Sequence, residues 1–199
     1  MQGVEYKIER KIRARDRGSL LFPDDFADQG SAESIRKALQ ALKVKGLIRS
    51  VAHGIYVRPK VSEYIGEVLP TAEEVAQAIA KRDKIRIVPT GVYALHALGL
   101  STQIPLNLVF LTDGAARTVK VGKRTIKLKK ATPKNLMAKG KISSLVIQAL
   151  REIGKDKASQ AELKQIVTLL KQEDLQLLEH DIKLAPEWIK KIMKKAIDE

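Results

Sequence analysis

A helical segment followed by a glycine-centred hairpin constrains the fold of this chain more than any other sequence feature. Ser31 is a favourable N-cap, apolar residues recur at helical spacing from Ile35 to Leu42, and Gly46 is typical of a helix end. Two short β-prone runs then flank the turn His53-Gly54. The pattern predicts an amphipathic helix that leads directly into a β-hairpin.

Two shorter helical segments precede this unit. Ile8 and Ile12 lie on one face of a helix expected between Glu5 and Arg15, and Pro23-Asp24-Asp25-Phe26 has the composition of a helix start. A helix, a short helix, an amphipathic helix and a hairpin, in this order, are typical of a winged helix-turn-helix, whose third helix docks in the DNA major groove. We therefore expect residues 1–69 to form such a domain.

The rest of the chain mixes strands and helices. Strand-like and helical segments alternate first, and they include a second hairpin around Gly122-Lys123; four helical segments follow between Ser143 and Ile197. Glu63 to Pro70 is expected to be a linker or a short bridging helix. The expected fold class is α+β: the N-terminal winged helix-turn-helix, then a mixed α/β domain at 70–199 with a helical C-terminal section from about residue 142.

Polar side chains on the predicted helix and hairpin are candidates for DNA contact. Arg and Gln can bind base edges through two hydrogen bonds, whereas Lys and Ser more often bind phosphates. An ordinary solvated helix face or polar hairpin would have a similar composition, so both interpretations stay open. The candidates are Ser31, Ser34, Arg36, Lys37, Gln40, Lys43, Arg49, His53 and Arg58.

The net charge of +14 indicates an anionic partner, most commonly a nucleic acid. Residues 1–70 contain 13 basic and 9 acidic side chains, residues 71–141 contain 14 and 4, and residues 142–199 contain 10 and 10. The excess is therefore greatest around the second hairpin. A second DNA-contacting surface, a site for an acidic or RNA-bearing partner, and simple solvation are all compatible with it. The basic candidates there are Arg117, Lys120, Lys123, Arg124, Lys127 and Lys129.

The sequence contains no pattern typical of catalysis. Cysteine is absent, and the three histidines do not have the spacing of metal ligands. We therefore expect no catalytic residues, no metal site and no cofactor. Neither an apolar run of bilayer length nor a signal-peptide core is present, so a soluble cytoplasmic protein without membrane contact is expected.

Three segments resemble AbiEi-type antitoxins of type IV toxin–antitoxin systems and their winged-helix relatives. They are the predicted helix and hairpin at Ser31–Pro59, the segment Pro89–Gln103 and the basic hairpin Arg117–Lys130; the likeness covers roughly residues 5–135. The resemblance implies an antitoxin encoded beside a nucleotidyltransferase toxin. Such a protein would repress its own promoter through the winged helix and counteract the toxin through the C-terminal domain.

The function expected from these observations is that of a DNA-binding transcriptional regulator, not an enzyme. Its partners would be double-stranded DNA with repeats of its own promoter, bound as monomer or dimer, and a nucleotidyltransferase toxin, counteracted directly or indirectly. One alternative is an antitoxin that neutralises a protein and binds DNA only secondarily. Another is a basic RNA-binding protein, which the aromatic content of 4% disfavours because single-stranded recognition depends on stacking.

Overall fold

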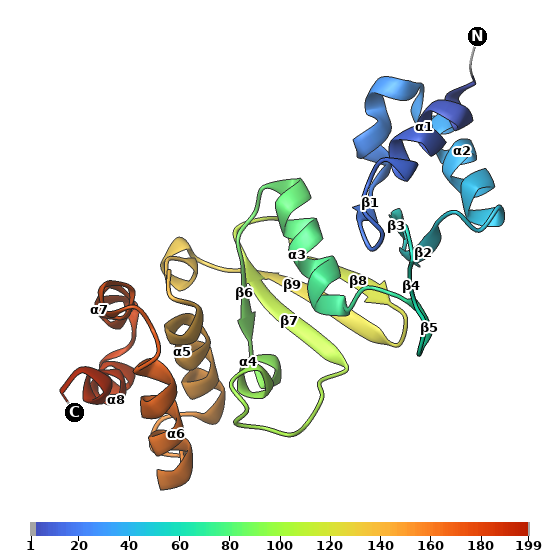
Figure 1. Ribbon diagram of the computed structural model, residues 1–199. Coiled ribbons are helices and arrows are strands. Elements are labelled where there is room, and N and C mark those ends of the chain that lie inside the picture. The colour runs from blue at the N-terminus through green and yellow to red at the C-terminus, as the bar shows by residue number, and fades with distance from the viewer. Residues whose placement is uncertain (1–2, 199) are drawn as a thin grey trace. The chain divides into compact units, whose positions relative to one another are not determined.

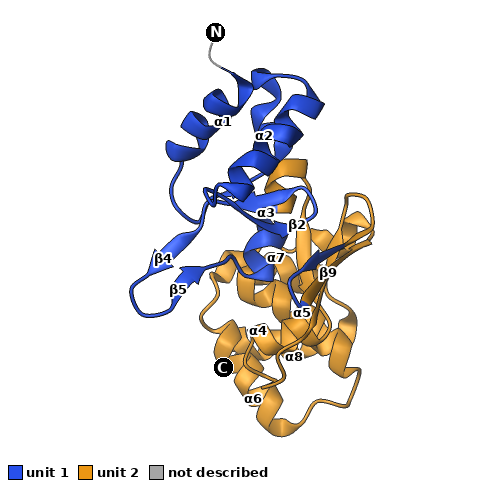
Figure 2. Cartoon of the chain, turned by 90° about the vertical axis from the view of Figure 1, so that its right-hand side faces the viewer, with its two compact units in different colours: residues 1–78, 119–123 blue, residues 79–118, 124–199 orange. Residues whose placement is uncertain are grey.

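The computed structural model describes residues 3–198, in which helices are combined with three small β-sheets. The chain divides into two compact units, shown in Figure 2: unit 1 is Met1–Ala78 with Val119–Lys123, and unit 2 is Ile79–Thr118 with Arg124–Glu199. The fold is therefore mixed α+β, as expected. The domain boundary after residue 69 stays a prediction, because a compact unit need not fold independently.

Unit 1 begins with three helical elements around one apolar core (Figure 1). The buried residues recur at helical spacing, including Ile8 and Ile12 of the first helix and Leu39 and Leu42 of the third, and they enclose Phe26. Its elements are α1 (Val4–Arg13), β1 (Leu20–Leu21), the 3-10 helix η1 (Pro23–Gln29), α2 (Ala32–Val44), β2 (Arg49–Ala52) and β3 (Ile55–Val57). The predicted helices and the hairpin are thus present.

The hairpin forms a three-stranded sheet with β1, in the order β1-β3-β2. Both pairs are antiparallel, so that Val57 faces Leu20 on one side and Arg49 on the other. Gly54 at the turn has a φ of +67°, a conformation that glycine adopts without steric cost. The short strand β1 therefore connects the hairpin to the helical part of unit 1.

A second, unexpected hairpin follows β3. The prediction of a linker or bridging helix between Glu63 and Pro70 was wrong, because β4 (Lys60–Ser62) pairs antiparallel with β5 (Gly66–Val68). Gly66 has a φ of +73°, which allows the tight reversal at the start of β5.

Unit 2 combines most of a four-stranded sheet with helices, and the rest of β8, from Val119 on, is counted with unit 1. Helix α3 (Ala72–Asp83) spans the division between the units, and the strand order is β6-β7-β9-β8. β6 and β7 are antiparallel, whereas β7 and β9 are parallel, with Phe110 opposite Leu128. The first elements of this part are β6 (Ile87–Thr90), α4 (Val92–Ala97), β7 (Asn107–Thr112), β8 (Arg117–Val121) and β9 (Arg124–Lys130).

The C-terminal section is helical, as expected, and its apolar stripes form a core. Buried residues of four helices pack with Ala94 of α4, among them Leu150, Ile166 and Met193. The elements are the 3-10 helix η2 (Pro133–Leu136), α5 (Lys141–Ile153), α6 (Gln160–Leu170), α7 (Leu175–Leu184) and α8 (Glu187–Asp198). Among the described residues, no helix combines the length and apolarity needed to cross a lipid bilayer.

Candidate nucleic-acid interface

Helix α2 has one apolar and one polar face. Its apolar side chains are buried in the core of unit 1, whereas Arg36, Lys37, Gln40 and Lys43 are exposed. Positions 36, 40 and 43 recur at intervals of four and three residues, so these side chains share one stripe of the helix surface. The structure therefore brings together the predicted candidates from the body of this helix.

The start of α2 is capped by its own serines. The Ser31 hydroxyl accepts a hydrogen bond from the Ser34 backbone N–H at 3.3 Å, and the Ser34 hydroxyl donates to the Ser31 carbonyl oxygen at 2.8 Å. Ser31 is exposed and Ser34 is half-buried. Both serines thus stabilise the helix end, where exposed N–H groups and the helix dipole also favour a phosphate.

Two of the α2 candidates already have partners within the helix. Lys37 forms an ion pair with Glu33 at 2.7 Å, and the Arg36 Nε donates to the Ala32 carbonyl oxygen at 3.3 Å. The ion pair is between two well-exposed side chains, where such pairs contribute about 0–1 kcal/mol. A phosphate or base could therefore replace these partners at small cost.

The hairpin candidates have different surroundings. His53 is exposed at the turn between β2 and β3. Arg49 makes two hydrogen bonds to the Glu67 carboxylate, at 2.9 and 2.8 Å, and so links β2 to β5. Arg58 donates to the backbone carbonyl oxygens of Arg13, at 2.9 Å, and Arg15, and so anchors the end of α1. Two of these three candidates therefore serve contacts within unit 1.

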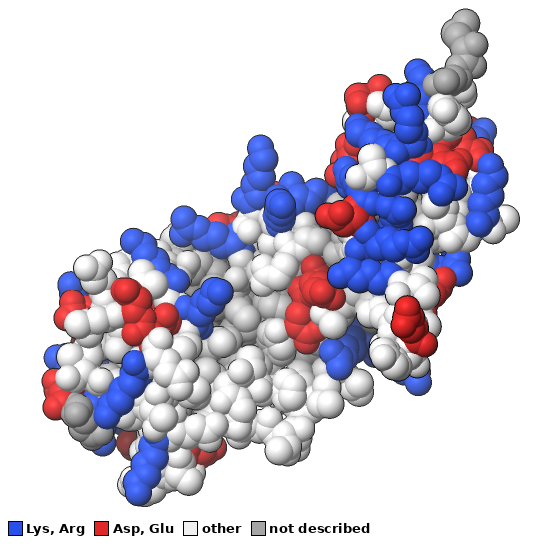
Figure 3. Space-filling view, viewed as in Figure 1, with Lys and Arg blue, Asp and Glu red and all other residues white. Residues whose placement is uncertain are grey.

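Basic residues of α1 are absent from the predicted set, although Figure 3 shows Lys and Arg gathered over unit 1. Lys7, Arg10 and Arg17 are exposed. Lys11 instead pairs with Asp28 at 2.9 Å. The high density of basic residues between positions 7 and 17 is a signal in the sequence that could have added this helix to the candidates.

The strands β8 and β9 carry most of the second basic group. Lys120, Lys123, Lys127 and Lys129 are exposed, and Arg124 is half-buried. On β9, Lys127 and Lys129 alternate with buried apolar residues, so the two lysines lie on the same face of the strand. The predicted alternation of this hairpin is thus present.

Arg117 differs from the other members of this group because it has a partner inside the fold. Its guanidinium forms an ion pair with Asp83 at the end of α3, and Arg82 also pairs with Asp83 at 2.7 Å. The hydrogen bond from Arg82, together with the charge and hydrogen bond of Arg117, lowers the pKa of Asp83 below its usual range. Arg117 therefore links β8 to α3.

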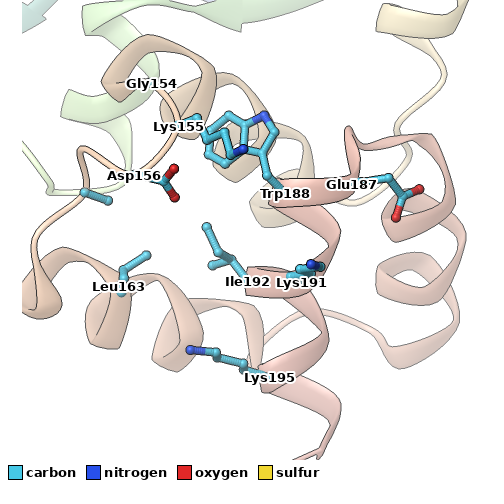
Figure 4. A pocket seen from close by; sticks show the side chains of 10 residues that line it. Gly154, Lys155, Asp156, Leu163, Glu187, Trp188, Lys191, Ile192 and Lys195 are labelled. Carbon is cyan, nitrogen blue, oxygen red and sulfur yellow. The ribbon is translucent and has the colours of Figure 1, made fainter.

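A cavity of about 420 Å³ lies between helices of the C-terminal section (Figure 4). Leu163, Trp188 and Ile192 supply apolar walls, and three lysines lie around them. Its two carboxylates, Asp156 and Glu187, lie on opposite sides of the cavity in Figure 4, so they do not form an acid–base pair.

The buried polar cluster at the start of α5 has a structural explanation. Asp181 is fully buried and accepts hydrogen bonds from the Lys139 and Gly140 N–H groups, from His180 Nδ1 and from the Ser143 hydroxyl. Ser143 is buried too, so its hydroxyl is not accessible to a substrate. Within the described residues, no group of three or more His, Asp and Glu side chains is arranged to bind a metal ion.

The comparison with protein families gives one match. A family model described as a family of unknown function (DUF6088) covers residues 7–178. The matched range includes α2, both hairpins of unit 1 and the basic strands β8 and β9, and it ends within α7. No curated protein matches the chain. Because the model covers most of the sequence, this protein belongs to the DUF6088 family.

Proposed function

We propose that the first part of unit 1 is a winged helix-turn-helix and that this protein is a DNA-binding transcriptional regulator. The order α1-β1-η1-α2-β2-β3, with its sheet order β1-β3-β2, supports this proposal. The observation that carries it is the division of α2 into a buried apolar face and an exposed face with Arg36, Gln40 and Lys43. A helix of this kind has the width and the polar surface that the major groove accepts.

In this proposal α2 is the recognition helix. Arg36 and Gln40 contact base edges, because a guanidinium matches guanine and a carboxamide matches adenine. Lys37 and Lys43 contact phosphates, and the serine-capped start of α2 approaches the backbone of the duplex. His53 at the turn of the first hairpin then contacts the phosphates beside the groove.

The internal partners of the arginines narrow the proposed contact set. Arg58 holds carbonyl groups of α1, Arg49 holds Glu67 and Arg117 holds Asp83. Each would have to give up a charge-assisted hydrogen bond before it could bind DNA, and such bonds contribute about 1.5–3 kcal/mol. We therefore assign specific DNA contact to α2 and the hairpin turn, and general phosphate attraction to the lysines of β8 and β9.

The resemblance to AbiEi-type antitoxins supports a more specific proposal. In it, this protein represses its own promoter and counteracts a nucleotidyltransferase toxin encoded beside it. Co-expression tests this part separately: the full chain should restore growth of cells that produce the neighbouring nucleotidyltransferase. Unchanged toxicity in the presence of the chain would reject the antitoxin role and leave the regulator role standing.

The test of DNA recognition is a binding titration with the DNA upstream of the gene and a scrambled duplex of equal length, at two salt concentrations. We expect a preference for the upstream DNA and weaker binding at higher salt, because bound phosphates release counterions. The variant R36A/K37A/Q40A should lose the preference, with binding to the upstream DNA weakened by about 100-fold or more.

A matched control removes the same number of positive charges and carboxamides elsewhere. The variant K164A/Q176A/K183A loses two positive charges and one carboxamide from exposed positions of α6 and α7. It should bind both duplexes as the unchanged chain does. Equal loss in both variants would mean that charge alone, and not the face of α2, determines binding.

A further inference from the structure

A continuous segment of unit 2 is free of charged side chains. From Ile87 to Thr112 the chain contains no Lys, Arg, Asp or Glu, although these residues make up 30% of the whole sequence. The segment forms β6, α4, the loop after α4 and β7. Charged residues resume immediately on both sides, with Arg86 and Asp113. Core packing alone does not require such a composition, because part of this segment is exposed.

The exposed part of the segment forms one uncharged face, which we call the neutral face. Figure 3 shows unit 2 almost entirely without charged atoms over α4 and the loop that follows. Ile104 and Leu106 in the loop are 63% and 67% exposed, and Val92 at the start of α4 is 39% exposed. Exposed apolar side chains in an uncharged segment are typical of interaction surfaces.

The loop that carries these side chains is held in place. The Gln165 side-chain amide donates to the carbonyl oxygens of Leu98 and Gly99, each at 3.3 Å. The Leu106 carbonyl oxygen accepts from the Thr125 N–H at 2.9 Å. Because the backbone is fixed at both ends of the loop, little conformational entropy would be lost when a partner binds there.

The charge of the chain indicates which partner fits this face. An acidic partner would be attracted by the exposed lysines and would gain nothing from a surface without them. A second copy of this chain carries the same net charge of +14 and would be repelled wherever basic surfaces meet. Two copies that meet through the neutral face bring no like charges of that face together, and interfaces between identical chains are also more apolar than other surfaces.

We propose that the neutral face is a self-association surface through which two copies of this chain form a symmetric dimer. In this dimer the neutral face of one copy packs against the neutral face of the other. Pairing of the edge strand β6 is disfavoured, because Pro89 at its centre has no N–H to donate. A two-fold symmetric dimer would present two copies of α2, as repeats in a promoter require.

The tip of β4–β5 provides a comparison. Tyr64 is 95% exposed and Val61 is 64% exposed, so this hairpin is also apolar at its surface. Glu63 and Glu67 lie within it, however, and its short strands offer little area. The hairpin therefore serves as the control surface for the test of the dimer.

The test is sedimentation velocity of the full chain, without DNA, from low to high micromolar concentration. We expect a species of twice the chain mass of 22.1 kDa. The variant I104K/L106K places new positive charge in the contact between two basic chains and should raise the dimer dissociation constant by roughly 100-fold or more. The control V61K/Y64K adds the same charge at the β4–β5 hairpin and should remain a dimer.

A milder variant keeps the test independent of any effect on folding. I104Q/L106Q adds no charge, and it should weaken the dimer by about tenfold through the loss of apolar contact. The proposal would be overturned if the unchanged chain were a monomer at all concentrations. It would also be overturned if the variant I104K/L106K were still a dimer. The experiment contains no DNA, so its failure leaves the proposed regulator function untouched.

Discussion

The two units differ in how their charged residues are arranged. Unit 1 places acidic side chains beside its basic ones, as in the pairs Lys11–Asp28, Arg15–Asp25 and Lys37–Glu33. In unit 2 Asp83 pairs with Arg82 and Arg117, but β9 exposes Lys127 and Lys129 on one face without acidic neighbours on that strand, and the neutral face carries no charge at all. The difference teaches that net charge and recognition need not coincide: an unbalanced surface attracts any polyanion, whereas specific reading requires a positioned helix.

The largest effect should come from breaking the core of one unit. Phe26 is fully buried in unit 1, and F26A should destabilise that unit by about 3–5 kcal/mol. Trp188, the single tryptophan, belongs to the helical core of unit 2, so its fluorescence reports unfolding of unit 2. We expect F26A to shift the denaturation curve measured by far-UV circular dichroism but not the curve measured by fluorescence.

The matched control for this prediction is F110A, which removes an equally buried ring from the sheet of unit 2. F110A should shift the denaturation curve measured by Trp188 fluorescence. Identical shifts by both variants would show that the chain unfolds as one cooperative unit, and the contrast between the two units would then not extend to their stability.

The next prediction separates sequence-specific DNA binding by α2 from non-specific attraction of DNA phosphates by the lysines. Replacing Lys120, Lys123, Lys127 and Lys129 by Ala should weaken binding to upstream and scrambled DNA equally, by about tenfold, and should reduce the salt dependence. Removal of the α2 side chains should instead weaken binding to the upstream DNA more than binding to the scrambled DNA. Titrations of both duplexes over a range of salt measure the two effects. A selective loss of upstream binding in the lysine variant would reverse the assigned roles.

Arg58 tests whether a basic residue of unit 1 acts on the fold or on DNA. In R58A the carbonyl groups at the end of α1 lose their donor, and unit 1 should lose about 1–3 kcal/mol of stability. Chemical denaturation followed by circular dichroism measures this change. Unaltered stability combined with weaker DNA binding would instead make Arg58 a phosphate contact.

The smallest effect concerns Asp83, whose pKa is lowered by Arg82 and Arg117. A lowered pKa in the folded state means that the ionised carboxylate stabilises the fold above the unfolded pKa of about 3.9, and that this stabilisation is lost as the pH falls through the folded value. D83N should therefore destabilise unit 2 by about 1 kcal/mol or less at neutral pH. The difference from the unchanged chain should disappear in acid, as measured by denaturation monitored through Trp188.

Local patterns explain which parts of the fold could be predicted from the sequence. The helices of unit 1 follow from apolar residues at helical spacing, such as Ile8 with Ile12, and the first hairpin follows from a glycine turn between β-prone runs. The β4–β5 hairpin was missed because none of its strand residues is buried, so its strands carry no apolar pattern like that of β3. The parallel pairing of β7 with β9 was also missed, since it joins segments that no local pattern connects.

The candidate site was predictable to a similar degree. Exposure of Arg36, Gln40 and Lys43 follows from helical periodicity alone. The internal partners of Arg49, Arg58 and Arg117 depend on residues distant in the sequence, so these arginines could not be separated from surface residues in advance. The neutral face could have been noticed as an uncharged run, but its exposure depends on the packing of α4.

The central claim is that α2 reads DNA, and the absence of cysteine allows a direct test of it. A single cysteine in Q40C, coupled to a photo-crosslinker, probes the exposed face of α2, and Q176C on α7 is the matched control. We predict that irradiation with upstream DNA crosslinks Q40C to bases of a defined site, while Q176C gives no such product. Absence of crosslinks from position 40, or equal and unlocalised crosslinks from both positions, would contradict the account.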